Sequence, residues 1–142
     1  MKTISLYKLN LITFCFLLGT LFSFSQNEHI DWSAQSYLVG VNGTEVELNN
    51  NLTKQGTNFT WVQNGYNNTS ETSSFNISLV TGNWNTSDNT GEIQYDLTTE
   101  DSTASLIING NAEGIIVVLS INDVNEIAAE SYTFYIESLT NL

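Results

Sequence analysis

Apolar and polar side chains alternate every second position along several stretches of this chain, and this period limits its fold more than any other feature. The alternation runs through residues 45–48, 75–79, 92–97, 104–108 and 132–137. Successive side chains of an extended strand point to opposite faces of a sheet, so each stretch predicts a strand with one buried face. A helical period is almost absent. We therefore expect an all-β fold.

The stretch from Ile115 to Leu119 differs from these, because all five of its residues are apolar. A continuous apolar run of this length is typical of a central strand that is covered on both faces. We expect it to belong to the core.

Turn signals separate the strand-like stretches. Asn-Gly pairs, which readily adopt the positive φ angles of tight hairpins, stand at 42–43, 64–65 and 109–110. Polar stretches that predict loops cover 49–56, 67–74 and 85–91. This regular spacing of strand-like stretches and turn signals indicates about eight strands in an antiparallel β-sandwich or a small β-barrel.

The N-terminus has the composition of an export signal. Lys2 and Lys8 precede an apolar run over 9–22, and small side chains occupy Ser23 and Ser25. The run is about 14 residues long, short of the roughly 20 that span a bilayer. We expect residues 1–25 to be a cleaved signal peptide of bacterial type. Residues 26–142 would then form a single domain in the periplasm, on the cell surface or outside the cell.

The charge of that domain is strongly negative. Lys54 is its one basic side chain against fifteen acids, which gives a formal charge of −14. Such a field repels nucleic acids and anionic membranes. It tolerates a neutral glycan, an apolar small molecule or a protein partner at the cell surface, and it also keeps an exported protein soluble. No pattern in the sequence assigns an oligomeric state.

The sequence lacks the residue types that most catalytic mechanisms require. Beyond residue 25 there is no cysteine and no arginine, and His29 is the one histidine. Covalent catalysis, phosphoryl transfer and zinc binding are therefore not expected. Glycoside hydrolysis needs only two carboxylates, yet no acid lies in a recognisable constellation. We expect a protein that is not an enzyme and needs no cofactor.

Calcium is the metal that the sequence favours most. Asp123, Asn125 and Glu126 offer oxygen ligands at close spacing, and Ca²⁺ prefers such ligands. The alternative is a solvated acidic loop.

Aromatic residues near turns are the best candidates for ligand binding. Trp61 and Tyr66 flank the Asn64-Gly65 pair, and Trp84 stands among short polar residues. A flat apolar ring beside amide and carboxylate groups is what a glycan surface needs. The alternative, that the ring belongs to the core, is strongest for Trp61.

One short motif bears on the fold. Gly82-x-Trp84 resembles the glycine-x-tryptophan motif of lipocalin-type barrels, which implies a barrel around an apolar ligand. In that family the motif opens the barrel, whereas here it lies in the second half of the chain. The sequence thus predicts a secreted, non-catalytic binding or adhesion module. A lipocalin-like barrel for an apolar ligand and a passive structural surface protein are the alternatives.

Overall fold

The computed structural model describes residues 30–65, 69–123 and 129–142, except for the side chain of Asp123. Within these ranges the chain forms nine strands, and none of it forms a helix that could cross a membrane. The strands are β1 (Trp32–Val41), β2 (Thr44–Gln55), β3 (Asn58–Asn64), β4 (Ser70–Asn85), β5 (Thr90–Thr98), β6 (Ser102–Asn111), β7 (Gly114–Asp123), β8 (Glu130–Ile136) and β9 (Ser138–Asn141).

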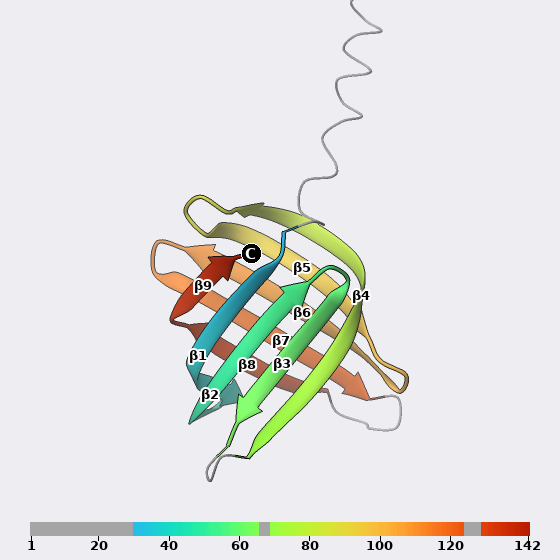
Figure 1. The fold of residues 1–142 in the computed structure, drawn as a ribbon. Coiled ribbons are helices and arrows are strands. Elements are labelled where there is room, and N and C mark those ends of the chain that lie inside the picture. The colour runs from blue at the N-terminus through green and yellow to red at the C-terminus, as the bar shows by residue number, and fades with distance from the viewer. Residues whose placement is uncertain (1–29, 66–68, 124–128) are drawn as a thin grey trace, which may run out of the picture.

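The strands close into an antiparallel barrel (Figure 1). Each strand from β1 to β7 pairs with the next, and β1 also pairs with β8 through Leu38–Val41. The ninth strand, β9, follows β8 and pairs with Trp32–Gln35 of β1. The predicted all-β fold is therefore confirmed, and a barrel of eight strands plus one is the form it takes.

Closure explains how a domain without proline manages its strand edges. An open sheet exposes unpaired backbone groups at both edges, whereas a closed barrel pairs them within the chain. The barrel has two ends. The terminal end carries residues 30 and 142 and the turns after β2, β4 and β6, and the opposite end carries the β1–β2 and β5–β6 connections and the described ends of β3 and β7.

Apolar side chains fill the interior. Trp32 lies 6.1 Å from Phe59 and 6.4 Å from Tyr95 between ring centroids, and Phe59 lies 6.0 Å from Phe75. Burying a side chain of this size contributes about 1.5–3 kcal/mol. The fully buried aliphatic residues of this core include Leu52, Ile93, Leu97, Leu106, Ile108, Val117 and Leu119.

The expectation that Ile115 to Leu119 is covered on both faces is wrong. Val117 and Leu119 point into the core, but Ile116 on the outer face is 41% exposed. The physical reason is the barrel, whose wall has one face inside and one face outside, with no second layer around it.

Two of the Asn-Gly pairs behave differently from each other. Asn42-Gly43 makes the β1–β2 turn with φ angles of 48° and 84°, as predicted. Asn109-Gly110 was expected to turn but lies within β6, and the turn comes at residues 112–113. Gly110 is required there for packing, because a Cβ atom would lie 2.6 Å from the Trp84 ring.

The predicted loops are confirmed only in part. Residues 86–89 form the turn between β4 and β5. Residues 49–55, however, continue β2, and β4 begins at Ser70. Pairing with β1 and β3 on either side stabilises polar residues 49–51 as strand, although their sequence favours a loop. The third Asn-Gly pair, 64–65, ends β3, and Gly65 N–H donates to the Thr69 carbonyl over 2.8 Å.

Candidate functional site

The tryptophans expected to bind ligand lie mainly inside the barrel. Trp61 on β3 is 5% exposed and packs against Tyr132 and Phe134 at 4.8 and 5.3 Å between ring centroids. Trp84 on β4 is 8% exposed. Tyr66, the third candidate, lies outside the described residues. Neither tryptophan presents a free ring face to a ligand.

Trp84 closes the terminal end of the core. Its ring covers Gly110, and it lines a small space together with Trp32 and Tyr95. That space leaves no volume for a water molecule. An apolar ligand inside the barrel would have to displace these rings.

The predicted calcium ligands fall outside what the structure describes. Asn125 and Glu126 lie in the segment 124–128, and the side chain of Asp123 is likewise not described. Among the described residues, no group of three or more histidine, cysteine, aspartate or glutamate side chains is arranged to hold a metal ion.

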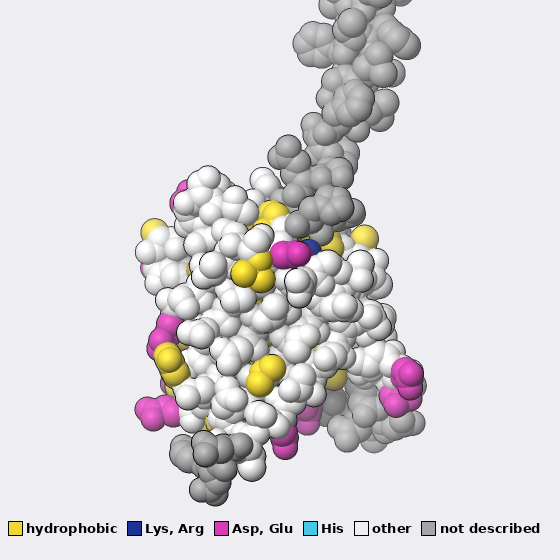
Figure 2. Space-filling view, in the orientation of Figure 1, with side chains coloured by type: hydrophobic (Ala, Val, Ile, Leu, Met, Phe, Trp, Pro, Cys, Tyr) yellow, Lys and Arg dark blue, Asp and Glu magenta, His cyan; other side chains and the backbone are white. Residues whose placement is uncertain are grey.

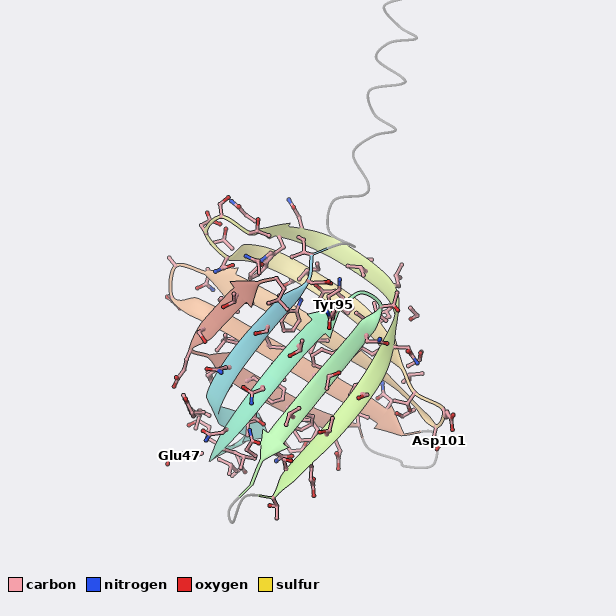
Figure 3. The ribbon with its side chains drawn as sticks, viewed as in Figure 1. Glu47, Tyr95 and Asp101 are labelled. Atoms are coloured by element: carbon pink, nitrogen blue, oxygen red, sulfur yellow. The ribbon has the colours of Figure 1, made fainter. Side chains whose placement is uncertain are left out.

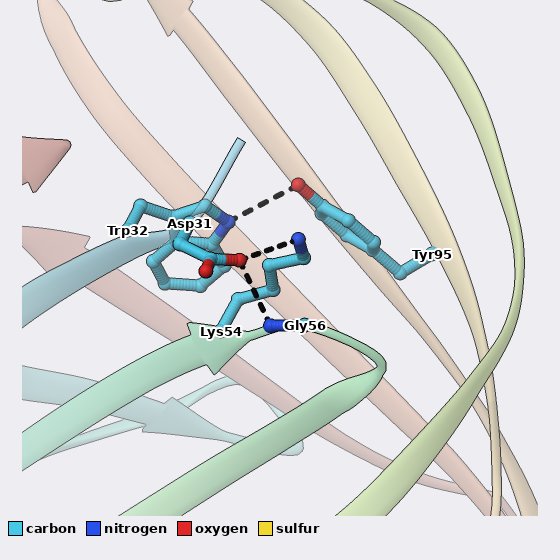
Figure 4. A network of polar contacts seen from close by, with 5 residues as sticks. All are labelled: Asp31, Trp32, Lys54, Gly56 and Tyr95. Carbon is cyan, nitrogen blue, oxygen red and sulfur yellow. Dashed lines mark hydrogen bonds and ion pairs between the residues drawn. The ribbon is translucent and has the colours of Figure 1, made fainter. Parts of the chain in front are cut away.

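Lys54 is buried at the terminal end of the barrel (Figure 4). Its Nζ lies 2.8 Å from Oδ1 of Asp31, and the same oxygen accepts the Gly56 N–H over 2.9 Å. Beside this ion pair, Trp32 Nε1 donates to the Tyr95 hydroxyl over 3.1 Å. Burial raises the pKa of Tyr95, and the charge of Asp31 raises it further, against the lowering effect of the Trp32 hydrogen bond. The one described cation is thus held by a carboxylate within the fold.

A groove of about 500 Å³ opens at the opposite end of the molecule. It lies between β1, β2 and the end of β3, and Tyr37 in it is 50% exposed. Its described lining is Tyr37, Leu38, Glu47, Leu48, Asn49, Asn64 and Gly65. Figure 3 shows Glu47 toward one end of the barrel and Tyr95 toward the other. A hollow of about 150 Å³ adjoins the groove and shares Tyr37, Asn49 and Asn64 with it.

Unequal strand lengths create this groove. The β2–β3 pairing stops at Asn49 and Asn64, whereas β2 continues to Thr44 in its pairing with β1. The β1–β2 hairpin therefore projects beyond the described end of β3. The β1–β2 register also shifts by one residue between Ser36 and Leu38. This shift breaks the alternation of β1, so that Tyr37 and Leu38 both lie toward the surface between buried Ser36 and Val39.

Buried polar side chains brace the shifted register. Ser36 Oγ donates to the Leu38 carbonyl over 2.6 Å, and Asn50 Nδ2 donates to the Leu48 carbonyl over 2.7 Å. Trp61 Nε1 in turn donates to Asn50 Oδ1 over 2.9 Å. A buried polar group needs such a partner, so these bonds fix the backbone of two groove residues. Trp61 therefore stabilises the groove from the core side, through its hydrogen bond to Asn50.

The groove combines a ring with amides and one acid. Asn49 and Asn64 each carry two donors and an acceptor, and Glu47 is the one carboxylate in the described lining. Such a set can form hydrogen bonds with hydroxyl groups, which both donate and accept them. Glycoside hydrolysis needs two carboxylates on either side of the scissile bond, and the described lining supplies one.

Sequence reasoning missed Tyr37, Asn49 and Asn64. Tyr37 looks like an ordinary strand residue until the register shift exposes it. The available signal is the triplet Asn49-Asn50-Asn51 next to an alternating stretch, although the polar composition of the triplet by itself predicts a loop. Comparison with protein-family models, curated proteins and solved structures finds no match to this chain.

Proposed function

We propose that this domain is a non-catalytic binding module that takes a neutral glycan in the groove around Tyr37. The observation that carries the proposal is the half-exposed Tyr37 ring beside Asn49 and Asn64 in a groove of about 500 Å³. Sites for small ligands have volumes of about 300–1,000 Å³ and combine an apolar face with a few polar groups. A sugar offers complementary chemistry, because its C–H face packs on a ring while its hydroxyls bond to amides.

Charge favours a neutral sugar over an acidic one. Glu47 lies in the groove, and the domain beyond residue 25 carries a formal charge of −14 from one lysine and fifteen acids. A uronic acid or a phosphate would meet repulsion here. Lys54, the one basic group of that domain, is paired with Asp31.

The proposal is tested by thermal unfolding in the presence of three oligosaccharides of equal length: a neutral glucan, an N-acetylglucosamine oligomer and an oligogalacturonate. A ligand at about 100 times its Kd stabilises the folded state by roughly 2.7 kcal/mol, which raises the unfolding midpoint. We expect a shift with a neutral sugar and none with the acidic one.

Two exposed tyrosines give a matched pair of variants. Tyr37→Ala removes the groove ring and should weaken neutral-glycan binding about tenfold. Tyr135→Ala removes an exposed ring on the outer wall, outside the described groove lining, and should leave glycan affinity unchanged. Equal affinities for Tyr37→Ala and the unchanged protein, or a shift with the acidic sugar alone, would overturn the proposal.

The apolar-ligand alternative makes a different prediction. Such a ligand must enter a core in which Trp32, Trp84 and Tyr95 leave no room for a water molecule. It should therefore bind slowly and loosen the packing of Trp84, so that a fluorescent fatty-acid probe would change tryptophan emission. A passive structural protein would respond to neither class of ligand.

A further inference from the structure

The outer wall of the barrel carries an apolar patch that meets the groove only at Leu38. Ile116 on β7 is 41% exposed and Tyr135 on β8 is 37% exposed. The two residues are direct cross-strand partners. The outer face, as we name this patch, consists of Leu38, Ile107, Ile116, Val118 and Tyr135.

The register orders these residues into two rows across the strands. One row runs Glu47, Leu38, Tyr135, Ile116, Asn109, Glu92, and the other runs Glu45, Gly40, Thr133, Val118, Ile107, Gln94. Neighbouring strands lie about 4.8 Å apart, so the apolar part from β1 to β6 is about 15 Å wide. Apolar side chains thus occupy the middle of the rows. Glu47 and Glu92 lie at the two ends of the first row, and Glu45 lies at one end of the second row, whose other end is Gln94.

The carboxylates are held in place around the patch. The Tyr135 hydroxyl donates to Glu45 Oε1 over 3.3 Å, and Asn109 Nδ2 donates to Glu92 Oε2 over 3.0 Å. These bonds position negative charge on both sides of the apolar centre. An acidic rim of this kind complements an apolar segment flanked by lysine or arginine.

Another sector of the same wall shows that the barrel does not require apolar side chains outside. The outer residues paired between β3 and β4 include Thr60 with Ser74 and Asn58 with Asn76. Figure 2, which views the molecule from the side of β1 to β4, shows only scattered hydrophobic side-chain atoms on this face. The apolar residues of the outer face are therefore a local feature, and contiguous patches of this kind mark interaction sites.

We propose that the outer face docks a basic, apolar segment of a partner protein beside the glycan groove, which shares Leu38 with the outer face and Glu47 with its acidic rim. Charge selects this occupant. A second copy in a symmetric contact would set Glu45, Glu47 and Glu92 against the same acids, and like charges that face each other destabilise an interface. A segment that alternates leucine with lysine meets both the apolar centre and the acidic rim.

The test uses three short labelled peptides and fluorescence anisotropy at about 0.15 M salt. One peptide alternates leucine with lysine, one serine with lysine, and one leucine with glutamate. We expect the leucine–lysine peptide to bind at least about tenfold more tightly than the other two. The double variant Ile116→Thr, Val118→Thr should weaken that binding about tenfold while its neutral-glycan affinity stays unchanged.

Two pairs of charge variants distinguish an effect of the acidic rim on peptide binding from a general attraction between a basic peptide and an acidic protein. Glu45→Gln with Glu47→Gln should weaken the peptide about fivefold, and Glu71→Gln with Asp101→Asn should change it by less than about twofold. Figure 3 shows Glu47 and Asp101 on opposite sides of the barrel. Equal effects of the two pairs would overturn the proposal.

Further outcomes decide the occupant. Equal binding of the leucine–lysine and serine–lysine peptides would overturn the proposal, as would a dimer in sedimentation that Ile116→Thr dissociates. If the threonine variants fail to fold, amide chemical shifts of the unchanged protein take their place. Peptide-induced shifts in β7 and β8 support the outer face, and shifts confined elsewhere overturn it.

Discussion

Trp61 and Asn50 lie on neighbouring strands inside the barrel, and the indole N–H of Trp61 donates to the Asn50 side-chain oxygen over 2.9 Å. The amide of Asn50 then donates to the Leu48 carbonyl, which belongs to the groove. A residue of the core is in this way linked to the surface where we propose that glycan binds.

Trp61→Phe tests this link. The variant leaves the Asn50 oxygen without its partner, and a buried acceptor in that state lowers the free energy of unfolding by about 1–3 kcal/mol. The loosened Leu48 backbone should also weaken neutral-glycan binding. Urea unfolding and glycan titration measure the two effects.

Trp32→Phe is the matched control, because it removes an equivalent indole bond to Tyr95 at the terminal end. It should lower stability by a similar amount and leave glycan affinity unchanged. If both variants bind glycan as the unchanged protein does, the groove does not depend on the Trp61 brace.

The fold was more accessible from sequence than the site was. The alternation of apolar and polar residues at 75–79 or 104–108 is a local pattern. A strand with one buried face is enough to produce it, so it can be read from the sequence. Barrel closure depends on β1 pairing with β8, which joins Val39 to Phe134 across most of the chain, and no local pattern encodes this. The groove likewise arises because β2 extends beyond the described end of β3 and because the β1–β2 register shifts beside Tyr37. Both are properties of strand pairing.

Gly110→Ala should destabilise the barrel by several kcal/mol, because the new Cβ atom would lie 2.6 Å from the Trp84 ring and in conflict with the Asn89 carbonyl oxygen. Displacement of Trp84 should shift its fluorescence to longer wavelength. Gly40→Ala provides the control, since its Cβ atom meets Thr133 at 3.5 Å, an ordinary contact. Similar unfolding midpoints for the two variants would contradict the packing role of Gly110.

Tyr132 should keep its proton in strongly alkaline solution. Burial, followed by the hydrogen bond to Glu130 and the charge of that residue, raises the pKa of Tyr132 from 10.0 to about 12. Between these values the unfolded chain loses the proton and the folded chain retains it. The stabilisation is therefore complete below pH 10 and is lost as pH rises toward 12.

Glu130→Gln removes the carboxylate charge and should lower the pKa of Tyr132 toward its usual range. The difference in tyrosinate absorbance between each protein and its Tyr132→Phe counterpart isolates this one group. An unchanged titration in Glu130→Gln would show that burial alone accounts for the shift.

Asp31→Ala should weaken the terminal end of the barrel. The variant removes the carboxylate paired with Lys54, whose side chain is 1% exposed, while Asp31 is 30% exposed. Breaking a fully buried pair lowers stability by roughly 3–5 kcal/mol, and partial solvation of Asp31 reduces the expected loss to about 2 kcal/mol. Asp88→Ala removes an exposed aspartate that accepts a bond from Thr90, and it should change stability by less than about 0.5 kcal/mol. Urea unfolding of both variants measures the difference, and equal losses would mean that burial of Lys54 does not depend on its pairing with Asp31.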